Sequence, residues 1–189
     1  MNKASALIAV EEPARFSAEE FMDMAAAGAF ENIVGKIELV EGVIIRMSPA
    51  HAPHFLYQRE LFLRLHEIFG AGRDGFIVGQ TPTVRLSEDT VRDPDVAILR
   101  LPAELGGIFA AADLLLAAEV SDSSLPKDRG SKRLSYARAG IPNYWVVDIR
   151  GRKVELWVSP EGGDYSSHRT IPFGEPIPVP GTAETITLD

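Results

Sequence analysis

The chain has 189 residues, of which 46% are hydrophobic and 24% charged, a composition typical of a globular protein with a sizeable core. It contains no cysteine, which excludes disulfide bonds and thiolate metal sites and fits a reducing cytoplasm. The formal net charge of −8 argues against a dedicated nucleic-acid-binding domain, which is usually basic. The N-terminal apolar run is too short for a signal peptide, and no segment approaches the ~20 apolar residues that span a membrane. We therefore expect a cytoplasmic protein.

The first part of the chain predicts a helix, a hairpin and a second helix. The helix over residues 16–28 begins with a capping-box sequence, in which Ser17 is followed three residues later by Glu20. Residues 36–49 alternate apolar and polar positions on both sides of a Glu-Gly turn, which predicts a β-hairpin. Residues 51–72 place leucine and isoleucine at helical spacing before a glycine, which predicts the second helix.

The rest of the chain predicts strands with one further helix. Expected strands cover residues 76–86, 94–101 and 113–120, with a polar turn at 87–93, and a strand pair covers 143–158. A short helix over 128–140 separates these two groups, and the tail, residues 165–188, predicts short edge strands and loops. We expect residues 1–15 to be an N-terminal extension and residues 16–189 to form one α/β domain, a central mixed β-sheet flanked by helices.

Three acidic residues, Glu38, Asp95 and Glu119, stand in otherwise apolar strand sequences. Burying an unpaired charge costs several kcal/mol, so each carboxylate should meet a cation or keep a proton. Pro94 cannot donate to a sheet ladder and marks the start of its strand, which places Asp95 at that end. Adjacent strands lie about 4.8 Å apart, so neighbouring strands in register would bring the carboxylates of Asp95 and Glu119 within reach of one ion.

Oxygen ligands without cysteine or an evident histidine cage suit Mg²⁺ or Mn²⁺ rather than zinc. Two of the three carboxylates have structural alternatives, since Asp95 could pair with Arg92 or cap a turn, and Glu38 could pair with Lys36. Glu119, on the most apolar strand, is the strongest candidate of the three.

Four short motifs follow one another in order along the chain. They read Glu38-Leu39-Val40-Glu41-Gly42, then Pro94-Asp95-Val96, then Glu119-Val120-Ser121-Asp122, and last Asp128, Lys132, Tyr136, Gly140-Ile141-Pro142 and Tyr144-Trp145. This series, within residues 16–150, resembles the Uma two family of the PD-(D/E)XK nuclease superfamily. The resemblance implies a restriction-endonuclease-like fold and metal-dependent hydrolysis of phosphodiester bonds in nucleic acid, with DNA favoured over RNA.

The resemblance also implies roles for particular residues. Asp95 and Glu119, with the backbone carbonyl of Val120, would hold Mg²⁺ or Mn²⁺, which polarises the scissile phosphate and acidifies a bound water. Glu38 would complete the catalytic site from the hairpin, as a metal ligand or as the partner of the active-site lysine. Several superfamily members act as dimers, so a homodimer is a candidate assembly.

One departure from the superfamily pattern concerns its lysine, which normally stands two residues after the glutamate. Ser121 occupies that place here, and the resemblance transfers the role to Lys132 in the following helix, with Lys127 as the alternative. Lys132 would orient or deprotonate the attacking water, or stabilise charge on the phosphate. A solvated surface lysine is the structural alternative.

Other residues carry weaker signals. His54, and less so His51, could cap the second helix or contact phosphate, and Gln80 could reach the site from a neighbouring strand. Aromatic residues near the last motif could stack on bases but are more often core: Tyr136, Tyr144 and Trp145. Residues 126–140 carry a local charge of +4, which predicts contact with a phosphate backbone or else a solvated helix face.

Three functional hypotheses follow. The first is a metal-dependent endonuclease acting on nucleic acid. The second is a catalytically inactive nuclease-fold module for binding or assembly, which the acidic net charge and the missing lysine after Glu119 favour. The third is a structural protein in which all three buried acids pair with arginine.

Overall fold

The computed structural model describes residues 12–47, 49, 51–70, 72–101 and 108–189, so the expected extension lies largely outside the described residues. Its helices are α1 Ala18–Ala26, α2 Ala52–Phe69, α3 Leu125–Lys127 and α4 Arg133–Arg138, with short helical turns η1 Arg73–Gly75, η2 Ala111–Asp113 and η3 Asp128–Lys132. Its strands are β1 Ile37–Val40, β2 Val43–Arg46, β3 Phe76–Gln80, β4 Val84–Arg85, β5 Val91–Arg92, β6 Val96–Arg100, β7 Phe109–Ala110, β8 Leu114–Ser121, β9 Asn143–Asp148, β10 Lys153–Glu161, β11 Asp164–Pro172, β12 Ile177–Pro178 and β13 Thr185–Ile186.

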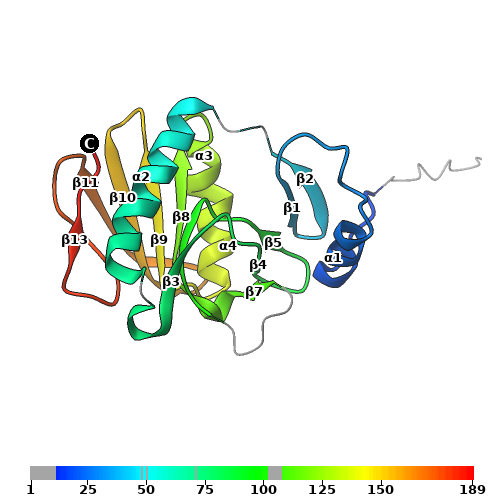
Figure 1. Ribbon diagram of the computed structural model, residues 1–189. Helices are drawn as coiled ribbons and strands as arrows, with labels where there is room; N and C mark the ends of the chain where they lie inside the picture. The colour runs from blue at the N-terminus through cyan, green and yellow to red at the C-terminus, as the bar shows by residue number, and fades with distance from the viewer. Residues whose placement is uncertain (1–11, 48, 50, 71, 102–107) are drawn as a thin grey trace, which may run out of the picture.

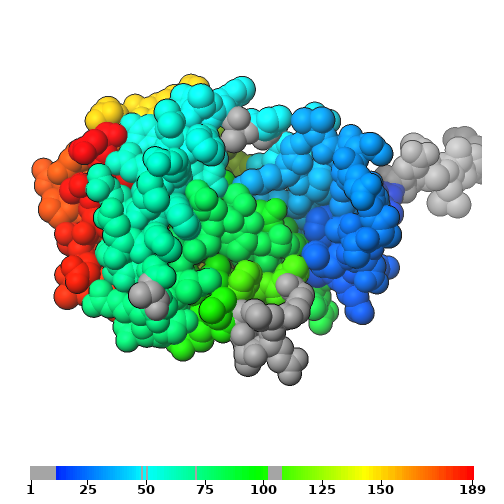
Figure 2. All heavy atoms as spheres, in the orientation of Figure 1, coloured from blue at the N-terminus to red at the C-terminus, as the bar shows by residue number. Residues whose placement is uncertain are grey.

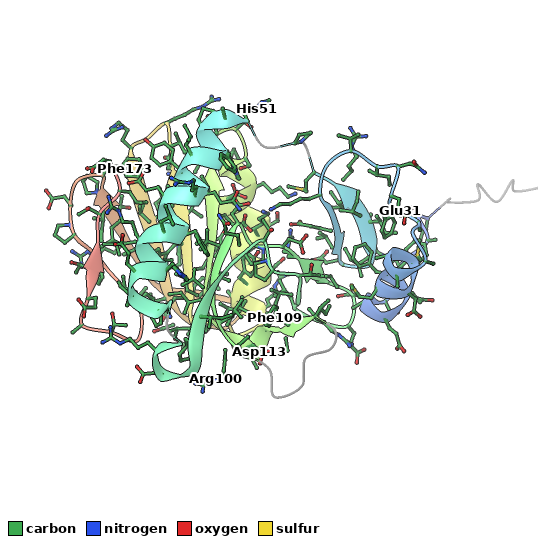
Figure 3. The ribbon with its side chains drawn as sticks, in the orientation of Figure 1. Glu31, His51, Arg100, Phe109, Asp113 and Phe173 are labelled. Carbon is green, nitrogen blue, oxygen red and sulfur yellow. The ribbon has the colours of Figure 1, made fainter. Side chains whose placement is uncertain are left out.

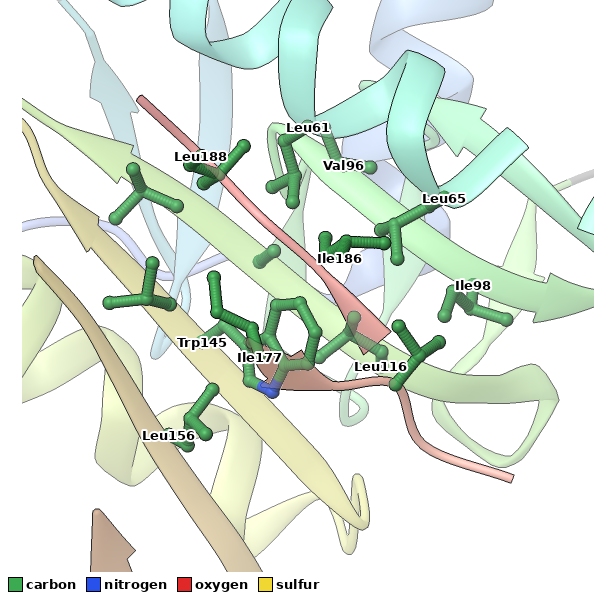
Figure 4. Packing of buried hydrophobic residues seen from close by; sticks show 14 of the residues in the cluster. Leu61, Leu65, Val96, Ile98, Leu116, Trp145, Leu156, Ile177, Ile186 and Leu188 are labelled. Carbon is green, nitrogen blue, oxygen red and sulfur yellow. The ribbon is translucent and has the colours of Figure 1, made fainter. Parts of the chain in front are cut away.

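A mixed sheet forms the centre of the molecule (Figure 1). Within the described residues its strand order is β11-β10-β9-β8-β6-β3, in which β8 and β9 are parallel and the other neighbours antiparallel. Helix α2 covers one face and packs Leu61 and Leu65 against sheet residues such as Leu116 and Trp145 (Figure 4). Helix α4 covers the opposite face through Tyr136. The expected central mixed sheet flanked by helices is confirmed.

A second, smaller sheet lies beside the first and carries the N-terminal elements. Its order is β2-β1-β5-β4-β7, and α1 packs on it through Phe21, against Leu39 and Val91. In the space-filling view, α1 and the β1–β2 hairpin form a lobe against the side of the central part (Figure 2). This arrangement places the hairpin opposite the first turn of α2.

The local predictions for the first helix and the hairpin are confirmed. The Ser17 hydroxyl accepts a hydrogen bond from the Glu20 backbone, and the Glu20 carboxylate accepts one from the Ser17 backbone. At the hairpin turn, Glu41 and Gly42 have φ values of 50° and 79°, the two positive values that a tight two-residue hairpin turn requires.

The predictions for residues 76–93 are wrong in two respects. The single strand expected over 76–86 divides at Thr81, whose φ of 47° turns the chain, so β3 stays in the central sheet and β4 joins the small one. The expected polar turn, residues 87–93, contains strand β5. The reason is tertiary, because β5 is stabilised by pairing with β1 and β4 rather than by a strand-like sequence of its own.

Two further boundaries differ from expectation. The helix expected over 128–140 begins earlier, at Leu125, and continues through a π-helical turn before α4. The tail contains a long edge strand, β11, which pairs with β10 along nearly its whole length. No helix in the described part of the chain is long and apolar enough to cross a membrane.

Candidate active site

The pairing of β6 with β8 brings two of the candidate carboxylates together. Val96 pairs with Ala118 in this antiparallel ladder, so Asp95, one residue earlier, lies opposite Glu119. Ala97 and Ala117, two residues along each strand, pack on the α4 side of the sheet, and alternation puts both carboxylates on that side. The register on which the shared-ion expectation depended is therefore present.

Both carboxylates line a cavity of about 520 Å³ at this end of the sheet. Its walls come from the hairpin, the first turn of α2, the end of β8 and η3. The lining residues are Gly35, Lys36, Glu38, Met47, Pro49, His51, His54, Asp95, Glu119, Val120, Asp122, Ser123, Ser124 and Lys132. His51 marks the end of α2 from which the chain leads back to the hairpin (Figure 3). The cavity thus collects side chains from segments distant in the sequence.

Asp95 is buried and fixed by donors on both carboxylate oxygens. Lys36 Nζ lies 3.0 Å from Oδ1, while His54 Nε2 lies 2.9 Å from Oδ2 and the backbone N–H of Val120 donates to the same Oδ2 at 2.9 Å. Gln58 donates to the backbone carbonyl of Asp95 at 2.8 Å. Burial alone would raise the pKa of Asp95, but the hydrogen bond from His54 and the charge of Lys36 outweigh it and hold the pKa well below its usual range.

Glu119 is the buried strand carboxylate that we expected either to meet a cation or to keep a proton. Lys132 Nζ lies 2.8 Å from its Oε2, and the Tyr136 hydroxyl donates to Oε1 at 2.8 Å. Burial raises the pKa of Glu119 to about 8, against the opposing effect of Lys132 and with a further upward contribution from Asp95. Glu119 therefore has a cationic partner and also binds a proton more tightly than an ordinary glutamate.

Lys132 is buried, so the interpretation as a solvated surface lysine is wrong. The π-helical turn places its ammonium group between Glu119 and Asp128, whose Oδ1 lies 3.7 Å away. Burial opposes its charge, but Glu119, Glu38 and Asp128 together raise the pKa of Lys132 above its ordinary value. At neutral pH this lysine is a hydrogen-bond donor and a positive charge.

Lys127, the alternative lysine, lies elsewhere. It is half-buried, and its Nζ contacts the sulfur of Met47 at 2.9 Å. Among the described residues it makes no ion pair with a carboxylate, and it does not line the cavity. The geometry therefore brings Lys132, and not Lys127, to Glu119.

Glu38 forms a fully buried ion pair with Arg92, with 2.9 Å between Oε2 and Nη1. Arg92 also donates to the Ser135 hydroxyl at 3.2 Å, which ties β5 to α4. The two ion pairs considered as structural alternatives are thus exchanged. Arg92 pairs with Glu38 instead of Asp95, and Lys36 pairs with Asp95 instead of Glu38. Glu38 Oε1 is buried without a hydrogen-bond partner among the described residues. Only one of the three buried acids pairs with arginine, which contradicts the third hypothesis.

Several site residues received too little weight or none from the sequence. His54 and Gln58 both hold Asp95, and their four-residue spacing places them on the same side of α2 as Leu61 and Leu65, a signal that periodicity could have given. Lys36 was visible only as a partner of Glu38. Asp128 belongs to the family motif, and its contact with Lys132 depends on the irregular helical turn.

Other candidates are not brought into the site. Gln80 is exposed and does not line the cavity. The aromatic residues near the last motif are buried core residues, and the Tyr144 hydroxyl donates to the backbone carbonyl of Asp128. The interpretation in which Tyr136, Tyr144 or Trp145 stacks on bases is therefore wrong, and these residues belong to the core.

Among the described residues, the carboxylate oxygens in this cavity suit a hard divalent cation. Mg²⁺ commonly takes one or two carboxylates from a protein and completes its shell with water and substrate oxygens. Asp95 and Glu119 provide two carboxylates on adjacent strand ends, and Glu38, whose Oε1 has no hydrogen-bond partner among the described residues, lines the same cavity. The described residues hold no preformed group of three or more His, Asp or Glu side chains arranged around one metal position.

Comparisons with known proteins agree with this picture. The family model of Uma2, described as "Putative restriction endonuclease", matches residues 18–189. A solved structure from Anabaena variabilis ATCC 29413, described as a putative nuclease belonging to DUF820, superimposes with a TM-score of 0.65 at 17% identity. The match covers 91% of this chain and 94% of that chain, and at this identity it shows the fold alone. No curated protein matches the chain.

Proposed function

Because this chain belongs to the Uma2 family, we propose that it is a metal-dependent endonuclease that hydrolyses phosphodiester bonds of nucleic acid, with DNA as substrate. Membership of this family supports a nuclease-like function in general. The observation that carries the finer proposal is the meeting of Asp95, Glu119 and Lys132 in one cavity. We also propose that the protein acts in the cytoplasm, because it lacks cysteine. The proposal of a homodimer rests on the family resemblance alone.

In this proposal Asp95, Glu119 and the carbonyl of Val120 hold Mg²⁺ or Mn²⁺. When bound, the ion supplies a polarised phosphate and a bound water of lowered pKa. Its charge would replace that of Lys36, whose ammonium group now contacts Asp95 Oδ1. His54 and Gln58 keep Asp95 in place during that exchange, because they bind its other oxygen and its backbone.

The chain's own residues divide the remaining work. Lys132, positively charged at neutral pH, stabilises negative charge that develops on the scissile phosphate and donates a hydrogen bond to orient water. Its raised pKa argues against the alternative in which it removes a proton from water. Glu38 raises the pKa of Lys132 and is itself held by Arg92.

A specific observation favours the second hypothesis, the catalytically inactive module. Each of the three carboxylates already has a cationic partner: Asp95 with Lys36, Glu119 with Lys132, and Glu38 with Arg92. Such pairing is expected of a site that no longer binds a metal ion. Metal binding is therefore the property that distinguishes the two functions.

Calorimetric titration of Mn²⁺ tests the proposal directly. The wild type should bind Mn²⁺ at one site, and Asp95→Ala and Glu119→Ala should each abolish binding, since each removes one of the two carboxylate ligands. Asp122→Ala is the matched control, because Asp122 lines the same cavity but pairs with Arg150. It should leave Mn²⁺ affinity unchanged.

Folding must be checked in the same variants by circular dichroism and thermal unfolding. Loss of Mn²⁺ binding with the fold intact supports the metal site. No binding of Mn²⁺ to the wild type at millimolar concentration, with or without an oligonucleotide, would transfer support to the inactive module. Unfolding of Asp95→Ala would favour a structural ion pair with Lys36 and His54.

The raised pKa of Glu119 gives the metal affinity a pH dependence. Its carboxyl group is protonated below about pH 8, and the proton must leave before the oxygen can bind a cation. Affinity for Mn²⁺ should therefore rise by about tenfold per pH unit from about pH 6 to 8 and level off above that. Calorimetry in buffers of different ionisation enthalpy should show release of roughly one proton per Mn²⁺ near pH 7. An affinity that is constant over this range would contradict the assignment of Glu119 as a ligand.

A further inference from the structure

The candidate carboxylates are nearly fully buried side chains in the lining of a cavity. Asp95 and Glu119 are only 4% and 2% exposed, and the cavity has a volume of about 520 Å³. Cavities of this size accommodate a ligand on the scale of one small molecule. A single nucleotide unit is on this scale, which favours a flexible strand that can insert one nucleotide over a rigid duplex.

Exposed apolar side chains stand next to the residues that line this cavity. In the described chain the large exposed hydrophobic residues are Ile33, Val34, Phe55, Leu56, Leu63 and Leu101. Four of these six lie within two residues of a cavity-lining residue: Ile33 and Val34 precede Gly35 and Lys36, and Phe55 and Leu56 follow His54. Phe55, 58% exposed, and Leu56, 60% exposed, are in the first turns of α2, directly after the histidine that binds Asp95.

The basic segment over residues 126–140 presents little unpaired charge for a duplex backbone. Arg129 pairs with Glu155 and Asp148, Arg133 with Asp164, Arg138 with Glu41, and Lys132 with Glu119. Among the described residues only Lys127 of these five cations makes no ion pair. Binding of duplex DNA depends on neutralising many phosphates with free cations. The expected backbone contact by this segment is therefore not supported.

From these observations, and resting on the proposed nuclease function, we propose that the substrate is single-stranded nucleic acid, with a base stacked on Phe55 while the adjoining phosphate enters the cavity. An exposed aromatic ring stacks on any base, and single strands are bound in this way without sequence readout. Phe55 is the described exposed aromatic residue nearest in sequence to the carboxylate-binding His54. Stacking on Phe55 would add binding free energy that the paired cations of residues 126–140 do not supply.

Fluorescence anisotropy with a labelled oligodeoxynucleotide, in EDTA and at low salt, tests the proposal. The probe is one mixed sequence, offered as a single strand and as the duplex. The wild type should bind the single strand at least tenfold more tightly than the duplex. Phe55→Ala should weaken single-strand binding by about tenfold, the loss expected for one stacked base. Leu63→Ala, an exposed apolar position eight residues further along the same helix, is the control and should bind like the wild type.

The outcomes separate the substrate from the function. Equal or tighter binding of the duplex, or an unchanged Phe55→Ala variant, would overturn the single-strand proposal. Cleavage of the duplex alone with Mn²⁺ would overturn it too while leaving the nuclease function standing. Cleavage of the single strand supports both. If single-strand binding depends on Phe55 but the protein neither cleaves the strand nor binds Mn²⁺, the preference for single strands is supported. The proposed nuclease function is then contradicted.

Discussion

Lys132→Met should lower kcat for phosphodiester cleavage by about 10²–10³-fold, the usual cost of removing one charge-stabilising donor from a buried site. The substitution keeps most of the length of the side chain and removes its charge and its three donors. Loss of the lysine charge raises the pKa of Glu119 further above about 8, so its buried carboxyl group stays protonated and uncharged. We therefore expect the variant to stay folded, so that the loss is one of activity.

Lys127→Met is the matched control for this experiment. Both lysines belong to one helical segment, but Lys127 contacts Met47 and makes no ion pair among the described residues. Its replacement should change kcat by less than tenfold. Single-turnover rates measured with saturating Mn²⁺ isolate the chemical step from binding. A large loss in Lys127→Met with an active Lys132→Met would assign the catalytic lysine to Lys127.

Arg92→Met should lower the free energy of unfolding by about 3–5 kcal/mol, because it leaves the carboxylate of Glu38 buried and unpaired. Among the described residues, one oxygen of Glu38 accepts its hydrogen bond from Arg92 and the other has no hydrogen-bond partner. The contact from Arg92 to Ser135 is lost as well. Urea unfolding monitored by circular dichroism measures this free energy, provided that the m-value is unchanged.

Two further variants show whether the loss comes from the buried charge. The double variant Arg92→Met with Glu38→Leu removes both charges and should recover most of the stability, since apolar replacements of buried ion pairs are often neutral. Arg64→Met removes an exposed pair with Glu60 and should cost about 0.5 kcal/mol or less. If the double variant is as unstable as Arg92→Met, packing and not the unpaired carboxylate explains the effect.

The local elements of the fold could be predicted because their causes lie within a few residues. The capping box of Ser17 and Glu20 and the turn at Glu41 and Gly42 form from neighbouring atoms, so their residue types are sufficient. Strand β5 could not be predicted, because its residues become a strand only through pairing with β1 and β4.

The candidate site shows the same division. The order of the motifs and the alternation of the strands were enough to expect that Asp95 and Glu119 share a face, and the register of β6 and β8 agrees. The metal site itself stays a prediction. Periodicity could have placed His54 and Gln58 on the buried side of α2, but which group they meet there depends on how α2 packs against the sheet.

By itself, the sequence determined that Glu38, Asp95 and Glu119 are buried, because apolar neighbours and period-two alternation are local properties of the chain. Only the tertiary structure decided which cation meets each of them. Arg92 reaches Glu38 across 54 residues and Lys36 reaches Asp95 across 59. The physical reason is that an ion pair forms over a few ångströms, and which charges come that close is set by the packing of separate strands and helices, with no trace in the sequence around either partner.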